Sequence, residues 1–130
     1  MPSPSRPAPP PLSPAIGGIV FIGFACLQFN DLEQYGSRGW YGWILFYGLV
    51  ALASFLSLWR PFPPLAYRLA AFGSLAGALF RATQIEPAKT VFTNQTNPAG
   101  NEAGGLLLAA LWLAWLAGVA RKIRRTRVSQ

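Results

Sequence analysis

Four apolar runs dominate the chain, and each is long enough to cross a lipid bilayer. They cover residues 15–32, 40–59, 65–82 and 104–120. At a helical rise of 1.5 Å per residue, runs of about 17–20 residues match the roughly 30 Å hydrocarbon core of a membrane. The runs are continuous rather than alternating and rich in Ala, Leu and Gly, which argues against strands. The sequence therefore predicts an all-α, integral membrane four-helix bundle.

The segments outside the runs have the composition of turns and tails. The breaks are GSRG at 36–39, RPFPP at 60–64 and a polar stretch over 84–100. Residues 1–14 include seven prolines, which lack the backbone donor of a helix, so they predict a disordered Pro-rich tail. Residues 121–130 form a basic tail. We expect three parts: tail 1–14, transmembrane domain 15–120 and tail 121–130.

A cleaved signal peptide is the alternative interpretation of the first run. Its N-terminal side holds a single Arg among prolines, and no A-x-A site follows it. The segment Gly23–Cys26 faintly resembles a lipoprotein cleavage site, but the bulky Phe24 fits that site poorly. A retained helix is the favoured interpretation.

The basic residues predict the orientation in the membrane. Four spans place both termini and the 60–64 loop on one side. That side carries eight basic residues and the other carries three; the eight are Arg6, Arg60, Arg68, Arg121, Lys122, Arg124, Arg125 and Arg127, and the three are Arg38, Arg81 and Lys89. All four acidic residues fall on the second side. The positive-inside rule therefore places both termini in the cytoplasm.

Composition excludes several classes of function. Only 12% of residues are charged and 52% are hydrophobic, which excludes an ordinary soluble domain. There is no His and a single Cys, Cys26, so we expect no Cys/His metal site, no His-based catalysis and no cofactor. The net charge of +7 suits anionic lipid headgroups at the basic tail rather than nucleic acid. Nine Arg against two Lys, with abundant Ala and Gly, are typical of a GC-rich bacterial genome, and we expect the protein in the bacterial inner membrane.

Small residues recur along the third run. Ala66, Ala70, Ser74 and Ala78 are four residues apart, and Gly73-x-x-x-Gly77 forms a neighbouring stripe. Small residues at this spacing let helices approach closely. We expect Ala70, Gly73, Ser74 and Gly77 to pack this helix inside the bundle. Formation of a homodimer through the same face is the alternative.

Two tryptophans share one face of the fourth run. Trp112 and Trp115 are three residues apart, with Trp112 near the middle of the membrane. Packing into gaps left by the small residues of the third helix is one interpretation. Contact with a bound lipid, quinone or pigment, or with a partner protein, is the other.

A polar cluster is expected at the outer membrane face. Gln28, Asn30 and Asp31 end the first run, Tyr47 lies about 10 Å into the second, and Glu102 opens the fourth beside a candidate N-cap at Asn101. Arg81 lies near the same face. The carboxylates can cap helices and pair with Arg, bind a cation or small solute, or share a proton. No nucleophile–base pair, phosphate loop or metal motif accompanies them.

At these residues the chain resembles the transmembrane protein 220 family, a group of small four-helix membrane proteins. That family ends its first helix with Q-x-N-D-P-D, matched by residues 28–31, and continues with W…Y, matched by Trp40 or Trp43 and by Tyr47. Its fourth helix opens with R-E-x-x-G-L, and this chain has NEAGGL at 101–106. Leu32-Glu33 and Asn101 depart from the pattern. The resemblance extends over about residues 16–120 and implies the four-helix fold, but it implies no reaction.

The leading hypothesis is therefore non-enzymatic. We expect a structural or accessory subunit that packs against another membrane component, either a membrane protein or a second copy of the chain. The alternative is a binder or carrier of a cation or small solute at the outer polar cluster. A membrane enzyme acting on lipid is a third hypothesis, which has only the paired carboxylates in its favour.

Overall fold

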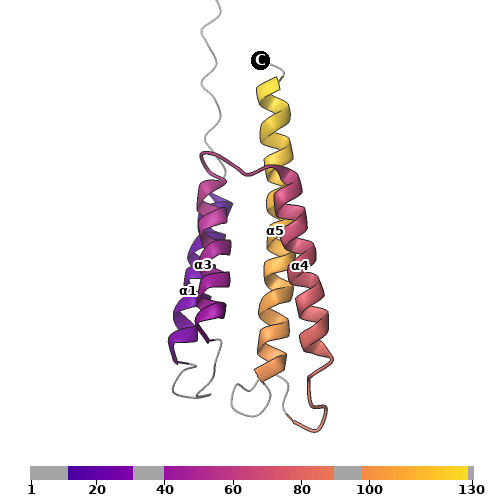
Figure 1. The fold of residues 1–130 in the computed structure, drawn as a ribbon. Helices are drawn as coiled ribbons and strands as arrows, with labels where there is room; N and C mark the ends of the chain where they lie inside the picture. The colour runs from indigo at the N-terminus through magenta and orange to yellow at the C-terminus, as the bar shows by residue number, and fades with distance from the viewer. Residues whose placement is uncertain (1–11, 31–39, 90–97, 129–130) are drawn as a thin grey trace, which may run out of the picture.

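The computed structural model describes residues 12–30, 40–89 and 98–128. These residues form four α-helices: α1 (Ser13–Leu27), α3 (Trp40–Leu56), α4 (Pro64–Ala82) and α5 (Pro98–Val128). A short 3-10 helix, η1 (Gln28–Asn30), follows α1, and none of the described residues lies in a strand. The helices lie side by side, and the chain enters α1 and leaves α5 at the same end of the bundle (Figure 1). The prediction of an all-α, four-helix fold is confirmed.

The helix ends differ from those of the apolar runs. α1 begins at Ser13, inside the segment expected to be non-helical, because a proline such as Pro14 is tolerated in the first turn. α5 begins at Pro98 rather than at residue 104, so Asn101 lies inside the helix and is not its N-cap. Proline at the first helical position has its φ already fixed for a helix. α5 also continues to Val128, because Arg and Lys are good helix formers.

Among the described helices, α5 alone is long and apolar enough by itself to cross a membrane. α1 and α3 are apolar but shorter, with 15 and 17 residues. Each ends before its apolar run does: η1 follows α1, and turns occupy residues 57–59 after α3. α4 has 19 residues but carries Arg68 and Arg81 near its two ends.

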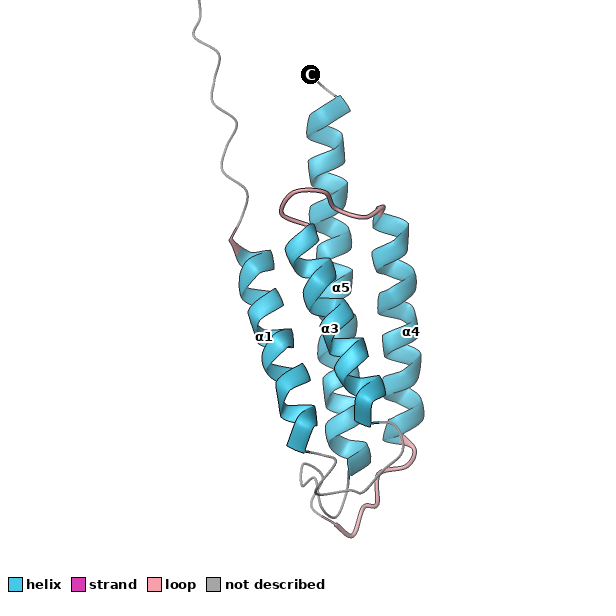
Figure 2. Ribbon diagram, turned by 60° about the vertical axis from the view of Figure 1, so that its left-hand side comes forward, coloured by secondary structure: helices cyan, strands magenta, loops and turns pink. Residues whose placement is uncertain are grey.

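The helices are arranged as two pairs, α1 with α3 and α4 with α5 (Figures 1 and 2). In the second pair, the buried residues of α4 and one stripe of the buried residues of α5 are separated alternately by three and four positions, the spacing of a close antiparallel helix pair. Most of them are small, which lets the backbones approach. They are Tyr67, Ala71, Ser74 and Ala78 on α4, and Ala103, Leu106, Ala110, Leu113, Ala117 and Ala120 on α5.

Glycines allow close packing around α1. Gly17 and Gly18 are both buried, and a methyl group on Gly18 would overlap the ring of Phe55 on α3. A methyl group on Gly17 would overlap the indole ring of Trp112 on α5. Gly17 therefore makes room for the α5 side chain that reaches across to the first helix pair.

Trp112 links the two pairs through a hydrogen bond as well as through packing. Its indole N–H donates to Ser54 Oγ at 2.8 Å. Ser54 is fully buried, and its hydroxyl donates to the carbonyl of Val50 at 2.7 Å. The hydroxyl thus serves as both acceptor and donor, and satisfies the indole N–H in an otherwise apolar interior.

We predict that Gly17→Ala destabilises the protein while Gly23→Ala, on the same helix, does not. Alanine at position 17 overlaps the Trp112 ring, and overpacking of this kind costs about 1–3 kcal/mol. Nothing lies within 4 Å of a methyl group at position 23, and Gly to Ala inside a helix stabilises by about 0.5–1 kcal/mol. Thermal unfolding of both variants in the same detergent measures the difference. Equal stability of the two would contradict this packing.

Candidate functional site

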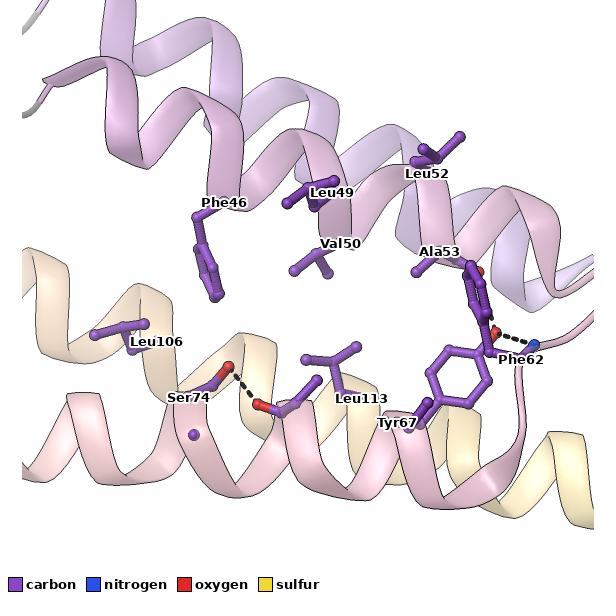
Figure 3. A pocket seen from close by; sticks show the side chains of 13 residues that line it. Phe46, Leu49, Val50, Leu52, Ala53, Phe62, Tyr67, Ser74, Leu106 and Leu113 are labelled. Atoms are coloured by element: carbon purple, nitrogen blue, oxygen red, sulfur yellow. Dashed lines mark hydrogen bonds between the residues drawn. The ribbon is translucent and has the colours of Figure 1, made fainter.

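An apolar groove lies between α3, α4 and α5. Its volume is about 550 Å³. α3 and α4 form its walls and α5 its floor, as Figure 3 shows. The lining residues are Phe46, Leu49, Val50, Leu52 and Ala53 on α3, Phe62 in the connection, Ala66, Tyr67, Ala70, Gly73 and Ser74 on α4, and Leu106 and Leu113 on α5.

The groove exists because α4 presents small residues toward α3. Ala66, Ala70 and Gly73 are exposed in the chain by itself, and a methyl group on Gly73 would meet nothing within 4 Å. On the opposite wall, Leu49 and Leu52 are 55% and 52% exposed. The short connection over residues 57–63 joins α3 to α4, and beyond Tyr67, near this connection, the small side chains of α4 leave the space between the two helices open.

The polar groups of the groove are occupied within the protein. The Tyr67 hydroxyl donates to the Ala53 carbonyl at 3.4 Å and accepts from the Phe62 N–H at 3.3 Å, so it ties the start of α4 to α3. The Ser74 hydroxyl donates to the Ala70 carbonyl at 2.9 Å. The groove therefore offers a ligand apolar surface rather than a hydrogen-bonding or reactive group.

The outer polar cluster contains an ion pair between α4 and α5. Arg81 pairs with Glu102, and their side chains are 29% and 23% exposed. Arg81 also donates to the side-chain oxygen of Gln84. Water is partly excluded from this pair, and the positive charge of Arg81 compensates the negative charge of Glu102. The ion pair therefore joins the end of α4 to the start of α5.

Gln28 and Tyr47 lie at the same end of the bundle. Gln28 is half-buried and donates through Nε2 to the carbonyl of Phe24 at 3.4 Å. Tyr47 is 4% exposed and its ring packs among four aromatic neighbours. Its hydroxyl lies over Gly105, where a methyl group would overlap it, one turn along α5 from Glu102. The neighbours of the Tyr47 ring are Phe21, Phe24, Trp43 and Phe46.

Part of the predicted cluster falls outside the description. Asp31 lies outside the described residues, and Asn30 ends η1. In the described part of the chain, Glu102 is brought to Arg81, and the Tyr47 hydroxyl to the first turns of α5. Within the same residues, no three His, Cys, Asp or Glu side chains gather as metal ligands would.

The small residues of α4 divide between two faces. Ser74 is buried against α5, and Gly77 is half-buried, with Leu106 lying 3.3 Å from where its Cβ would be. Ala70 and Gly73 are exposed and line the groove, and Ser74 lies at its inner edge. On α5, Trp112 is internal, whereas Trp115 stacks on it at a centroid distance of 4.7 Å and stays 41% exposed.

Comparison with protein families identifies a membrane family. The family model described as "Transmembrane family 220, helix" matches residues 20–118. The chain belongs to transmembrane family 220. The match covers most of the chain, including α3, α4 and most of α1 and α5, and it confirms the family resemblance seen in the sequence. Comparisons with curated proteins and with solved structures gave no match.

Sequence reasoning missed two residues that organise this member of transmembrane family 220. Ser54 and Tyr67 are 0% and 2% exposed. The Ser54 hydroxyl accepts a hydrogen bond from α5, and the Tyr67 hydroxyl donates one to α3. A signal for Ser54 was present: a hydroxyl inside an apolar span needs an internal partner, and it marks a helix contact. Tyr67 resembled an interfacial anchor because it lies near the start of its run.

We predict that Glu102→Gln destabilises the protein by about 1–2 kcal/mol, because it leaves the partly buried Arg81 without its counter-ion. Glu86→Gln is the control. Glu86 pairs with Lys89 at 2.8 Å, but their side chains are 60% and 44% exposed, so its loss costs less than about 1 kcal/mol. Chemical unfolding of the two variants in the same detergent checks the contrast. An equal or smaller effect at position 102 would refute a structural role for the ion pair.

Proposed function

We propose that this protein is a multi-pass membrane protein with both termini in the cytoplasm, and that it acts as a non-enzymatic accessory component. In this role it packs against another membrane component along the groove between α3, α4 and α5. The observation that carries the proposal is the open apolar groove with exposed small residues on one wall. In a membrane, small residues facing outward are where an apolar partner can approach the backbone closely.

The character of the groove favours binding over chemistry. Its two hydroxyls, from Tyr67 and Ser74, are engaged within the protein. At the outer face, the charge of Glu102 is compensated by Arg81, which lowers the affinity of that carboxylate for a cation. Both observations support an accessory role over a carrier of cations or a lipid-modifying enzyme.

The distribution of charge supports the orientation. We call the end formed by residues 57–63, the first turns of α1 and α4 and the last turns of α5 the basic end (Figure 1). Seven of the nine basic residues in the described ranges lie there: Arg60, Arg68, Arg121, Lys122, Arg124, Arg125 and Arg127. The positive-inside rule assigns such an end to the cytoplasm. The Arg-rich composition further supports a bacterial inner membrane.

The orientation predicts which residues are labelled from outside the cell. In a background with Cys26→Ser, we expect Ala88→Cys to react with a membrane-impermeant maleimide in intact cells. Val128→Cys, at the basic end and 88% exposed, should react only after permeabilisation. Mass shift of the protein on a gel measures both. Labelling of position 128 in intact cells would contradict the proposed topology, because it would place this end of the bundle outside the cell.

The groove itself is tested by photocrosslinking. We expect a benzoyl-phenylalanine in place of Phe46, whose ring lines the groove, to give a defined adduct with a membrane component in native membranes. The control replaces Phe72, which is 72% exposed but does not line the groove, and should give diffuse labelling only. Mass spectrometry of the adducts identifies the component. The same products from both positions would show that the groove binds nothing specifically.

A further inference from the structure

We infer that the component in the groove is an anionic phospholipid, with an acyl chain against α3 and α4 and its phosphate at the basic end. The inference rests on the proposed function and names its partner. It is carried by three observations: the length of the groove, its position along the helices and the charges beyond one of its ends.

The groove is shorter than a membrane span. Its lining on α4 runs from Ala66 to Ser74, about 12 Å of helix at 1.5 Å per residue. A transmembrane helix crosses the roughly 30 Å hydrocarbon core and would contact the groove over less than half of that length. An acyl chain of one leaflet is confined to half of the core, so the groove can cover most of it.

On α4 the groove lies in the half of the helix nearest the basic end, and its lining on α3 and α5 reaches past the middle of the bundle, to Phe46 and Leu106. Its lining on α4 begins at Ala66, two residues after the helix starts, and Phe62 in the connection also lines it. A length of about 12 Å fits within one leaflet, which is half of the roughly 30 Å hydrocarbon core. An acyl chain of the leaflet at the basic end therefore reaches the groove while its headgroup stays at the surface.

Arginines stand where the phosphate of that lipid would lie. Arg124 follows Leu106 by about five full turns of α5, so it continues the face of α5 that forms the groove floor. This part of α5 extends beyond the other helices (Figure 2). Arg60 precedes Phe62 by two positions, and both arginines are exposed. An anionic headgroup above the groove would meet two positive charges, and it would be attracted to them more strongly than a zwitterionic headgroup.

The test is native mass spectrometry of the full chain with phosphatidylglycerol and phosphatidylcholine. We expect the unmodified protein to retain one phosphatidylglycerol in preference to phosphatidylcholine. Arg124→Gln should reduce that preference about fivefold, because one basic residue strengthens binding to an anionic lipid surface by about that factor. Arg68→Gln is the control, since Arg68 is exposed on the far face of α4 from Ala66 and Ala70 and should leave the preference unchanged.

A second variant pair tests the chain-binding part. Ala70→Leu with Gly73→Leu fills the groove and should abolish retention of both lipids. Ala76→Leu, which adds the same side chain outside the groove, should not. Thermal unfolding checks that the filled variant folds; if it does not, the Arg124→Gln result, on an exposed turn, decides alone.

The possible failures are distinguishable. Equal retention of the two lipids by the unmodified protein, or undiminished retention by the filled variant, would overturn the phospholipid inference. A peptide adduct from the photoprobe at position 46 would also overturn it while leaving the accessory role standing. Identical labelling from positions 46 and 72 would overturn both.

Discussion

The bundle depends on one side chain of α5 that reaches the first helix pair. The α4–α5 pair and the α1–α3 pair each pack closely, but α3 and α5 make few backbone contacts. Trp112 bridges that distance, with its ring against Gly17 and its N–H on Ser54. A large, rigid indole therefore sets the separation of the two pairs, and the buried hydroxyl that receives it fixes which way the ring points.

The same separation explains why a groove opens on the other side of α5. Trp112 holds α3 at the distance of an indole ring, whereas α4 turns Ala66, Ala70 and Gly73 toward that space. The large indole ring fills the space between α3 and α5, but the small side chains of α4 are too short to fill a space of similar width between α4 and α3. Tyr67 closes part of the difference near the connection, where its hydroxyl reaches α3. The remaining space is apolar, of the size of ligand pockets, and lies within the helical bundle.

Much of the fold could be predicted from the sequence, but the division of faces could not. Continuous apolar runs predict helices and their order, and four consecutive spans predict that both termini and the 60–64 loop lie at the same end. The four-residue repeat from Ala66 to Ala78 suggested one packed face, yet the buried positions of α4 alternate four and three, through Tyr67 and Ala71. Alanine is compatible with either face, so only the partner helix decides. The outer cluster was predicted by chain order, and its Arg81–Glu102 pairing came from the register of α4 and α5.

The unequal lengths of the helices have a consequence for the surrounding bilayer. α1 and α3, with 15 and 17 residues, are about 22 and 25 Å long, whereas α5 has 31 residues and is about 46 Å long. A membrane about 30 Å thick would have to thin beside the first pair and could stay relaxed beside the second. This unequal hydrophobic mismatch would favour association with other membrane proteins beside α1 and α3, where the bilayer is thinned. It would also favour localisation of the protein in thinner membranes.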